Sequence, residues 1–215
     1  MSCCARHGQE ELFGERFARR AAKRYRRKGP DPMARALARR ASARGLEDAT
    51  VLEIGGGIGQ VLLQLLAGGA RAGEVVELVP AYEHEAASLA AEAGVGERAS
   101  YRTADLVADP ESRREADVVV LNKVVCCTPD GIELAGIAAG LARRTLVLSF
   151  PRGVWWARAA FGGANLVFRI RCRRFRTFVH SPEELRAAIE QHGLELASTR
   201  DGPLFRIAAF ERAYP

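Results

Sequence analysis

Short apolar runs and amphipathic stretches alternate along most of the chain, beginning at Thr50. The apolar runs have the length of strands, whereas the stretches between them repeat their apolar positions with the period of a helix. The expected strands are residues 50–54, 74–79, 100–104, 117–121 and 145–150, and the expected helices are residues 60–67, 80–93 and 129–142. Thr128 is the expected N-cap of the last helix, before Pro129. This alternation predicts an α/β fold with a mostly parallel sheet and helices on both faces.

A different pattern precedes this alternation. Apolar residues recur every four positions from Phe13 to Tyr25, with arginines between them, so an amphipathic helix is expected. A second helix begins after Asp31, which has the N-cap position before a proline. We therefore expect residues 1–45 to form an Arg-rich helical cap, or lid, on a main domain of residues 46–215.

The C-terminal part of the chain has a third pattern. A helix is expected over residues 153–169, and a capping box that begins at Ser181 opens a helix that ends at Gly193. Two strand-like runs, residues 194–199 and 204–211, then flank an Asp-Gly-Pro turn. They predict a C-terminal antiparallel hairpin.

The composition is typical of a soluble protein of one domain, with 48% hydrophobic and 27% charged residues among 215. The longest charge-free run, residues 54–70, is shorter than a membrane span, and the N-terminus lacks an apolar signal core. A cytoplasmic location without a transmembrane segment is therefore expected. Basic residues outnumber acidic ones by 13 to 6 in residues 1–50 and by 11 to 6 in residues 151–215. Such basic ends suggest an anionic partner, although a GC-rich genome would also enrich arginine.

The cysteines predict neither disulfides nor a metal centre. They are the vicinal pairs Cys3 and Cys4, and Cys126 and Cys127, and the single Cys172. Neighbouring cysteines cannot close an ordinary disulfide without strain. The Cys-Cys-x-x-His pattern that ends at His7 lacks a second pair of ligands, so free thiols are expected.

Glycines follow the first predicted strand in the stretch VLEIGGGIGQ. Gly55, Gly57 and Gly59 let the chain turn tightly and let a ligand approach the backbone. The spacing departs from the dinucleotide fingerprint, which would place its third glycine where Gln60 stands. Glu77 ends the next strand, and a carboxylate there can accept hydrogen bonds from both hydroxyls of a ribose.

With these motifs the chain resembles the class I S-adenosylmethionine-dependent methyltransferases. The resemblance covers about residues 45–215 and rests on the pattern Glu-x-Gly-x-Gly-x-Gly that starts at Glu53, on Glu77, and on Ala-Asp-Leu at residues 104–106. It implies a Rossmann-like sheet of seven strands, the last of them antiparallel, and S-adenosylmethionine as the cofactor. The cofactor-binding residues that it implies are Glu53, Gly55, Gly56, Gly57, Gly59, Glu77, Leu78, Asp105, Leu106 and Asn122.

The resemblance also implies a role for several of these residues. Glu53 would help to hold the amino group of the cofactor, Glu77 would bind the ribose hydroxyls, and Asp105 would bind the adenine amino group. Leu78 and Leu106 would lie beside the adenine ring. The residues alone leave other interpretations open, namely the two glutamates as strand-end charges and Asp105 as the cap of a loop. All three lie at the carboxyl ends of successive predicted strands, where open α/β sheets bind ligands, so we expect them to meet at one site.

Within that class, the loop after the fourth strand and residues 148–150 and 176–195 are similar to magnesium-protoporphyrin O-methyltransferases and their bacterial relatives. In this fold the loop after the fourth strand lies beside the transferable methyl group. The porphyrin enzymes have a histidine in that loop, where this chain has cysteines, and an N-terminal tyrosine near the acceptor. The acceptor-binding residues that this implies are Tyr25, Lys123, Cys126 and Cys127.

The expected function is transfer of a methyl group from S-adenosylmethionine to a small anionic acceptor, such as a carboxylate or another oxygen nucleophile. An ionised acceptor needs no general base, so no catalytic residue is assigned; His180 is expected to be structural, with a base as the alternative. The chain contains no Asn-Pro-Pro-Tyr motif, which argues against methylation of nucleic-acid bases.

Three features leave alternatives open. Cys126 and Cys127 have three possible roles: packing in the core, lining the acceptor pocket, or forming a thiolate site for a thiol or metalloid acceptor. The arginines of residues 169–176 and of the N-terminal helices are compatible with a solvated face, membrane-proximal charge, a clamp for carboxylates, or an RNA-binding methyltransferase. Because no base is evident, a cofactor-binding protein without catalysis is a further alternative.

Overall fold

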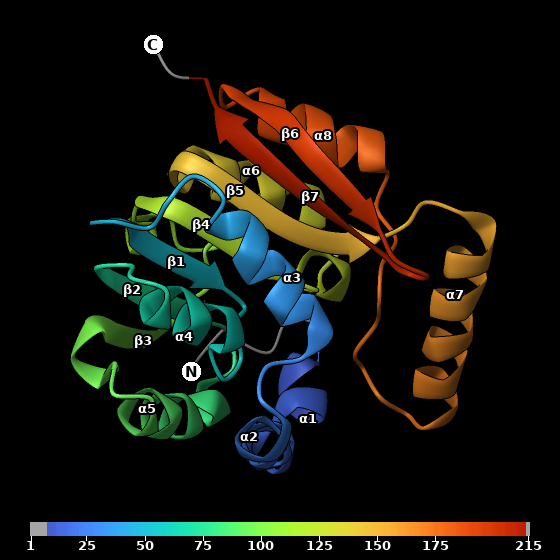
Figure 1. Cartoon of the computed structure of the whole chain (residues 1–215). Helices are drawn as coiled ribbons and strands as arrows, with labels where there is room; N and C mark the ends of the chain where they lie inside the picture. Colours follow the sequence, from blue (N-terminus) through green and yellow to red (C-terminus); the bar gives the residue numbers. More distant parts are fainter. Residues whose placement is uncertain (1–7, 214–215) are drawn as a thin grey trace.

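The structure is a computed structural model that describes residues 8–213, and its centre is a seven-stranded sheet in the order β3-β2-β1-β4-β5-β7-β6 (Figure 1). The strands are β1 Thr50–Ile54, β2 Ala72–Glu77, β3 Ala99–Thr103, β4 Ala116–Asn122, β5 Ala142–Pro151, β6 Leu194–Asp201 and β7 Phe205–Arg212. Neighbouring strands are parallel from β3 to β5, and β7 is antiparallel to both β5 and β6. The predicted Rossmann-like sheet with its C-terminal antiparallel hairpin is confirmed. Cys3, Cys4 and His7 lie outside the described residues.

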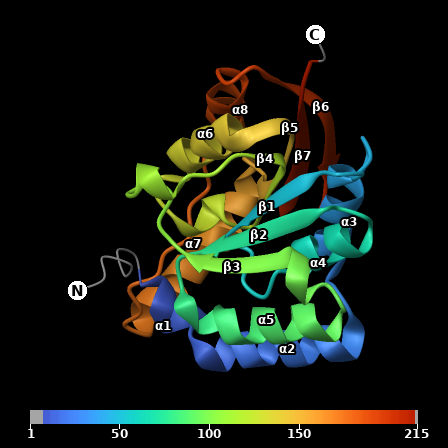
Figure 2. The same ribbon diagram turned by 90° about the vertical axis from the view of Figure 1, so that its left-hand side faces the viewer.

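Helices cover both faces of the sheet (Figures 1 and 2). They are α1 Gln9–Phe13, α2 Glu15–Lys28, α3 Pro32–Ala41, α4 Gln60–Ala67, α5 Glu83–Glu92, α6 Gly131–Leu141, α7 Trp155–Ile170 and α8 Pro182–Glu190, with short 3₁₀ turns η1 Pro80–Tyr82, η2 Gly96–Arg98, η3 Pro110–Ser112 and η4 Val125–Cys127. One buried cluster joins α3, α4 and α5 to Val51 and Val118, and the other joins α6 and α8 to Leu52 and Val119. Successive residues of a strand thus face opposite layers, as the pleat requires.

The N-terminal amphipathic helix expected from Phe13 to Tyr25 is divided at Gly14 into α1 and α2. Gly14 has an extended backbone, with φ −69° and ψ −175°, and ends one helix while it begins the next. The division lets α1 lie against η4, where the side-chain amide of Gln9 donates to the carbonyl oxygen of Cys127 at 3.1 Å. α3 packs against β4 and β5, whereas α2 packs against α5 and η1. We call α1 and α2 the roof (residues 9–28), although Ala18 and Ala22 of α2 belong to the same buried cluster as α3. The boundary of the cap at residue 45 stays a prediction.

The helix expected from residue 129 begins two residues later, at Gly131. Thr128 has an extended backbone, and its hydroxyl accepts a hydrogen bond from the amide of Asp130 at 3.2 Å, so the expected N-cap at Thr128 is wrong. His180 Nε2 lies 2.9 Å from the carbonyl oxygen of Val125 and 3.0 Å from that of Thr128, and it donates to these two acceptors. His180 thus holds both carbonyl oxygens outside the helix, which supports the structural role predicted for it.

Candidate functional site

A cavity of about 780 Å³ opens at the carboxyl ends of β1, β2 and β4. Its volume lies in the ordinary range for a ligand site. Of the site residues predicted from the sequence, those that line it are Tyr25, Gly55, Gly56, Gly57, Glu77, Leu78, Asp105, Leu106, Asn122, Lys123, Cys126 and Cys127. Glu53 and Gly59 are not among the lining residues. The fold therefore brings most of the predicted residues together, as the end-of-strand argument requires.

The glycine turn after β1 has a backbone that favours glycine at three positions. Gly55, Gly57 and Gly59 have φ values of 61°, 56° and 72°, in the left-handed region. A Cβ atom on Gly55 would lie 2.7 Å from Cγ2 of Val124, and one on Gly57 would lie 3.4 Å from the ring of Tyr82. The turn thus exposes its backbone to the cavity without side chains between backbone and ligand.

Glu77 is the carboxylate that faces this turn. One of its oxygens accepts from the amide of Gly57 at 3.0 Å, and the other accepts from the amide of Leu78 at 2.9 Å and from that of Val79 at 3.4 Å. Burial raises the pKa of Glu77, and the three amide donors oppose that increase because they stabilise the carboxylate. The side chain is therefore held at the end of β2, in the cavity, with oxygens that can accept further hydrogen bonds.

Glu53 is directed to the first turn of α4. It is 1% exposed, and its carboxylate accepts from the amide of Leu62 at 2.7 Å and from that of Val61 at 3.4 Å. Burial raises the pKa of Glu53 to about 8, although both amides favour the ionised form. The expected contact of Glu53 with the cofactor stays a prediction, whereas its contact with α4 fixes the glycine turn between them.

We expect the free energy of unfolding to fall as the pH rises from about 5 to about 8, in part because of Glu53. A carboxyl group with a raised pKa in the folded state stabilises that state below its ordinary pKa, and the contribution is lost as the pH rises through the folded value. Glu53→Gln should reduce this slope by at most about 1.4 kcal/mol per pH unit. Denaturant unfolding across this pH range measures the slope, with the exposed Glu97→Gln as the control. Equal slopes in wild type and Glu53→Gln would contradict the raised pKa.

Asp105 and Leu106 follow β3 and line the cavity, and their contact with the adenine stays a prediction. Oδ1 of Asp105 accepts from the amides of Val107 and Ala108 at 3.0 and 3.1 Å, which closes a turn. Leu106 is almost fully buried within the cluster that contains α6. Asp105 therefore acts as a loop cap and also has a place at the cavity, so the two interpretations of this residue are compatible.

The loop after β4 is positioned by Ser149 of the neighbouring β5. The hydroxyl of Ser149 accepts from the amide of Lys123 at 2.8 Å and donates to Oδ1 of Asn122 at 3.2 Å. Lys123 has a φ of 61°, which is uncommon outside glycine, and its ammonium lies 6.0 Å from the centre of the Phe205 ring. This turn directs η4, with its two cysteines, towards the cavity.

Cys126 and Cys127 form a close pair of thiols in η4. Their Sγ atoms are 3.9 Å apart and lie 3.3 and 3.2 Å from the carbonyl oxygen of Lys123. The hydrogen bond between the thiols lowers the pKa of Cys126 and raises that of Cys127, and burial adds to the increase at Cys127. Together with Cys172 they are free thiols, as predicted. Among residues 8–213 no group of three His, Cys, Asp or Glu side chains could hold a metal ion.

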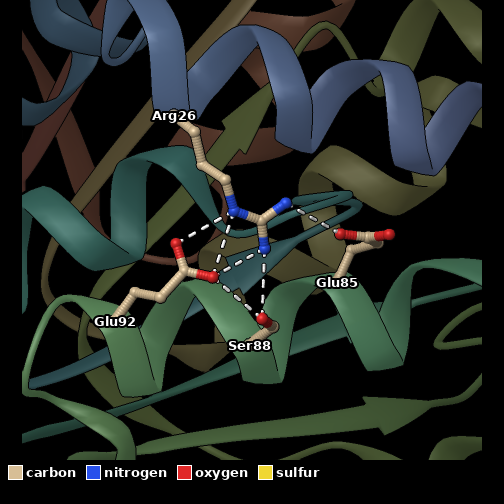
Figure 3. A network of polar contacts seen from close by, with 4 residues as sticks. All are labelled: Arg26, Glu85, Ser88 and Glu92. Atoms are coloured by element: carbon tan, nitrogen blue, oxygen red, sulfur yellow. Dashed lines mark hydrogen bonds and ion pairs between the residues drawn. The ribbon is translucent and has the colours of Figure 1, made fainter.

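A network of polar contacts holds the roof to the main domain outside the cavity (Figure 3). The guanidinium of Arg26 on α2 binds the carboxylate of Glu92 on α5 at 2.7 and 2.9 Å. The same group contacts Glu85 at 3.3 Å and the hydroxyl of Ser88 at 3.1 Å. All three partners lie on α5, so α2 is fixed along α5 while its other side faces the cavity.

Aromatic side chains line the part of the cavity between the roof and α7. Phe13 and Phe17 come from the roof, Phe161 and Phe168 come from α7, and Phe175 follows α7. The ring of Phe175 packs edge-to-face against Phe13 and Phe168, with centroids 5.3 and 5.5 Å apart. Phe13, Phe17 and Phe161 were not predicted as site residues, because contacts between segments more than 100 residues apart leave no local signal. The recurrence of apolar residues every four positions from Phe13 was the local signal that could have indicated the rings of the roof.

The arginines of residues 169–176 do not line this cavity. Arg173 donates to the carbonyl oxygen of Glu11 at 3.4 Å, and Arg176 donates to that of Phe175 at 2.7 Å. The basic residues that do line the cavity are Arg20, Arg24 and Lys123. The arginines of residues 169–176 are therefore not a clamp in this cavity, whereas the carboxylate clamp stays a prediction for Arg20 and Arg24 of α2.

Together, the glycine turn, the carboxylate at the end of β2 and the sheet with an antiparallel β7 define an S-adenosylmethionine-dependent methyltransferase. Comparison with known proteins agrees with this class. The model of the methyltransferase domain family matches residues 24–199, and the chain belongs to this family. No curated protein matches the sequence.

Solved structures share the fold at low sequence identity. Magnesium protoporphyrin IX methyltransferase from Synechocystis, with bound S-adenosylhomocysteine, has a TM-score of 0.71 at 19% identity and covers 95% of this chain and 100% of that one. An O-methyltransferase family protein from Burkholderia thailandensis has a TM-score of 0.73 at 20% identity, with coverage of 96% and 63%. A TehB-like methyltransferase from Corynebacterium glutamicum has a TM-score of 0.62 at 19% identity, with coverage of 91% and 98%.

Proposed function

We propose that the protein transfers the methyl group of S-adenosylmethionine to an apolar acceptor that carries a carboxylate or another anionic oxygen. The composition of the acceptor end of the cavity carries this proposal. Aromatic rings of the roof and α7 surround it, and Arg20, Arg24 and Lys123 supply positive charge. Aromatic walls bind an apolar body, whereas a guanidinium or ammonium group binds a carboxylate.

The residues at the other end of the cavity fit the cofactor. Glu77 would accept hydrogen bonds from the ribose hydroxyls, the turn at Gly55 and Gly57 would admit the methionine part, and Asp105 and Leu106 would hold the adenine. When bound, S-adenosylmethionine supplies a methyl group that is already electrophilic. For Glu53 we propose a positioning role, because its carboxylate binds the start of α4 and thereby fixes the glycine turn.

The protein's task at the acceptor is then to orient it and to exclude water. A carboxylate is ionised at neutral pH, so its oxygen can attack without a general base. Lys123, whose backbone is fixed by Ser149, would orient the anionic group. The roof would cover the reacting atoms and exclude water from them, and the pairing of Gln9 with η4 supports this arrangement.

A panel of acceptors tests the proposal, with the demethylated cofactor measured as the product. We expect aromatic carboxylic acids to be methylated faster than short polar acids, since only the former fill the aromatic end. Phe168→Ala should lower kcat/KM for an aromatic acid by at least about tenfold. Leu166→Ala, on the outer side of the same helix, should leave it unchanged. Equal rates for short polar and aromatic acids, or no turnover of any carboxylate, would contradict the proposal.

A second candidate acceptor is a soft nucleophile, a thiol or a trivalent arsenical. The close pair of thiols in the cavity favours it, because vicinal sulfurs are ligands for soft metalloids. On the same panel, methylation of arsenite that is lost in the double variant Cys126→Ser, Cys127→Ser would support this candidate. Unchanged methylation of carboxylates by that variant would instead assign the two cysteines to packing.

A further inference from the structure

α7 has apolar residues on the side that faces away from the rest of the molecule. It stands at one side of the sheet (Figure 1). Trp155, Ala159, Gly162, Leu166 and Ile170 follow one another at steps of three or four residues, so they lie on one stripe of the helix, which we call the outer stripe. Trp155, Leu166 and Ile170 are 75%, 57% and 72% exposed. Polar residues normally occupy such a face in a soluble protein. An exposed apolar patch at this position therefore indicates a surface that binds a partner.

The opposite side of α7 is already occupied. Ala157 is fully buried, and Phe161 and Phe168 line the cavity. The rings and small side chains of this inner side account for the packing of α7 on the protein. Beyond the edge-to-face contact of Trp155 with Trp156, the outer stripe therefore contributes little to the packing of the described chain, and its apolar residues need another explanation.

The charge around the outer stripe is positive. Residues 152–180 contain seven arginines and no aspartate or glutamate. The arginines are Arg152, Arg158, Arg169, Arg171, Arg173, Arg174 and Arg176. Three acidic groups of other elements reach this segment: Asp201 pairs with Arg152, Glu11 accepts from the amide of Arg174, and Arg158 is close enough to Glu183 to help lower the pKa of that carboxyl. Most of the positive charge is thus available to an anionic surface.

We propose that α7 binds the surface of a membrane that contains anionic lipids. The helix axis would lie in the plane of this membrane. The outer stripe would enter the boundary between headgroups and acyl chains, with Trp155 at the level that tryptophan prefers. Arg158, Arg169 and Arg171 would contact lipid phosphates. No helix within residues 8–213 is long and apolar enough to cross a membrane, so the contact is one of surface binding.

The two features together favour a bilayer over other partners. RNA would use the arginines but would leave the exposed side chains of Leu166 and Ile170 in water. A second copy of the chain, with its α7 packed against this α7, would cover the outer stripe. It would also bring the arginines of the two copies together, and like charges repel. An anionic bilayer satisfies both the apolar stripe and the positive charge. The docking does not depend on the identity of the methyl acceptor, so its test is independent of the proposed function.

The tryptophans provide a probe for the test. The chain has two, Trp155 and Trp156, and both lie on α7. With vesicles of phosphatidylcholine and phosphatidylglycerol in a 7:3 ratio, we expect a blue shift of the tryptophan emission and sedimentation of the protein with the vesicles. With vesicles of phosphatidylcholine alone, both effects should be much weaker, because the positive charge then has no partner.

Two sets of variants separate the apolar and the electrostatic contributions. Leu166→Ser with Ile170→Ser should weaken vesicle binding by at least about tenfold. Arg169→Gln with Arg171→Gln should weaken it by about 30-fold, since each arginine near an anionic surface is worth about 1 kcal/mol. These side chains are exposed, so circular dichroism should show unchanged folding.

A matched control tests whether any loss of charge has the same effect. Arg71→Gln with Arg114→Gln removes two exposed arginines that precede β2 and β4, at the end of the sheet opposite the cavity, and it should leave vesicle binding within about twofold.

Three results would overturn the proposal. The first is no binding to anionic vesicles by the wild-type protein. The second is a concentration-dependent dimer that shifts the tryptophan emission without lipid and is lost in the Leu166→Ser, Ile170→Ser variant. The third is salt-sensitive binding of RNA through Arg169 and Arg171 by a protein that ignores vesicles.

Discussion

Glu77→Ala should raise the dissociation constant of S-adenosylmethionine by about 100-fold. Two hydrogen bonds from ribose hydroxyls to a carboxylate would be lost, and each is worth about 1.5 kcal/mol or more. The variant would also lose the contact between Glu77 and the amide of Gly57, which holds the glycine turn. Titration calorimetry measures the change, and Glu77→Gln, which keeps an acceptor oxygen, should show a smaller loss.

Glu74→Ala is the matched control for this prediction. Glu74 lies on the same strand, but its carboxylate pairs with the guanidinium of Arg102 at 2.9 Å and does not line the cavity. This variant should keep the affinity for S-adenosylmethionine within about twofold. If Glu77→Ala were folded and bound the cofactor as tightly as the wild type, the assignment of the ribose site would be wrong.

Gly131→Ala should destabilise the protein by about 3 kcal/mol or prevent folding. A Cβ atom at this position would lie 2.4 Å from the carbonyl oxygen of Val125 and 2.4 Å from Nε2 of His180. Neither neighbour can move easily, because His180 also holds the carbonyl of Thr128. The change would therefore disturb the loop that carries Cys126 as well as the start of α6.

Gly136→Ala provides the comparison within the same helix. A Cβ atom there would have its nearest neighbour, the carbonyl oxygen of Ala188, at 3.7 Å, which is ordinary contact. Alanine favours a helix more than glycine does, so this variant should be neutral or more stable by up to about 1 kcal/mol. Urea unfolding of both variants measures the difference. A Gly131→Ala protein as stable as Gly136→Ala would show that the loop can shift to accommodate the methyl group.

Local signals were sufficient for much of the fold and for the cofactor end of the site. The bounds of β1 and α4 agree with the prediction, because an apolar strand and a helix meet there at glycines. Ser181 caps α8 as predicted, with its hydroxyl accepting from the amide of Glu184 at 3.3 Å. Glu77 was found because a carboxylate at the end of the second strand has a direct chemical meaning.

Long-range contacts explain what the sequence left open. Glu53 has the position of a cofactor ligand in the motif, but only the structure shows that the amides of α4 bind it. Likewise, the start of α6 depends on His180, about 50 residues further along the chain. The aromatic end of the cavity joins three separate segments, so no pattern within one segment could predict it.

The position of β7 has a consequence for how the protein is made. β5, with 10 residues, is largely buried on both faces, yet one of its edges pairs only with β7, which is the last strand along the chain. During synthesis that edge stays open after the parallel part of the sheet has formed. An open apolar edge is a template for aggregation, and such distant pairing forms slowly. Until β7 enters the sheet between β5 and β6, the nascent chain therefore exposes an apolar edge that favours mispairing.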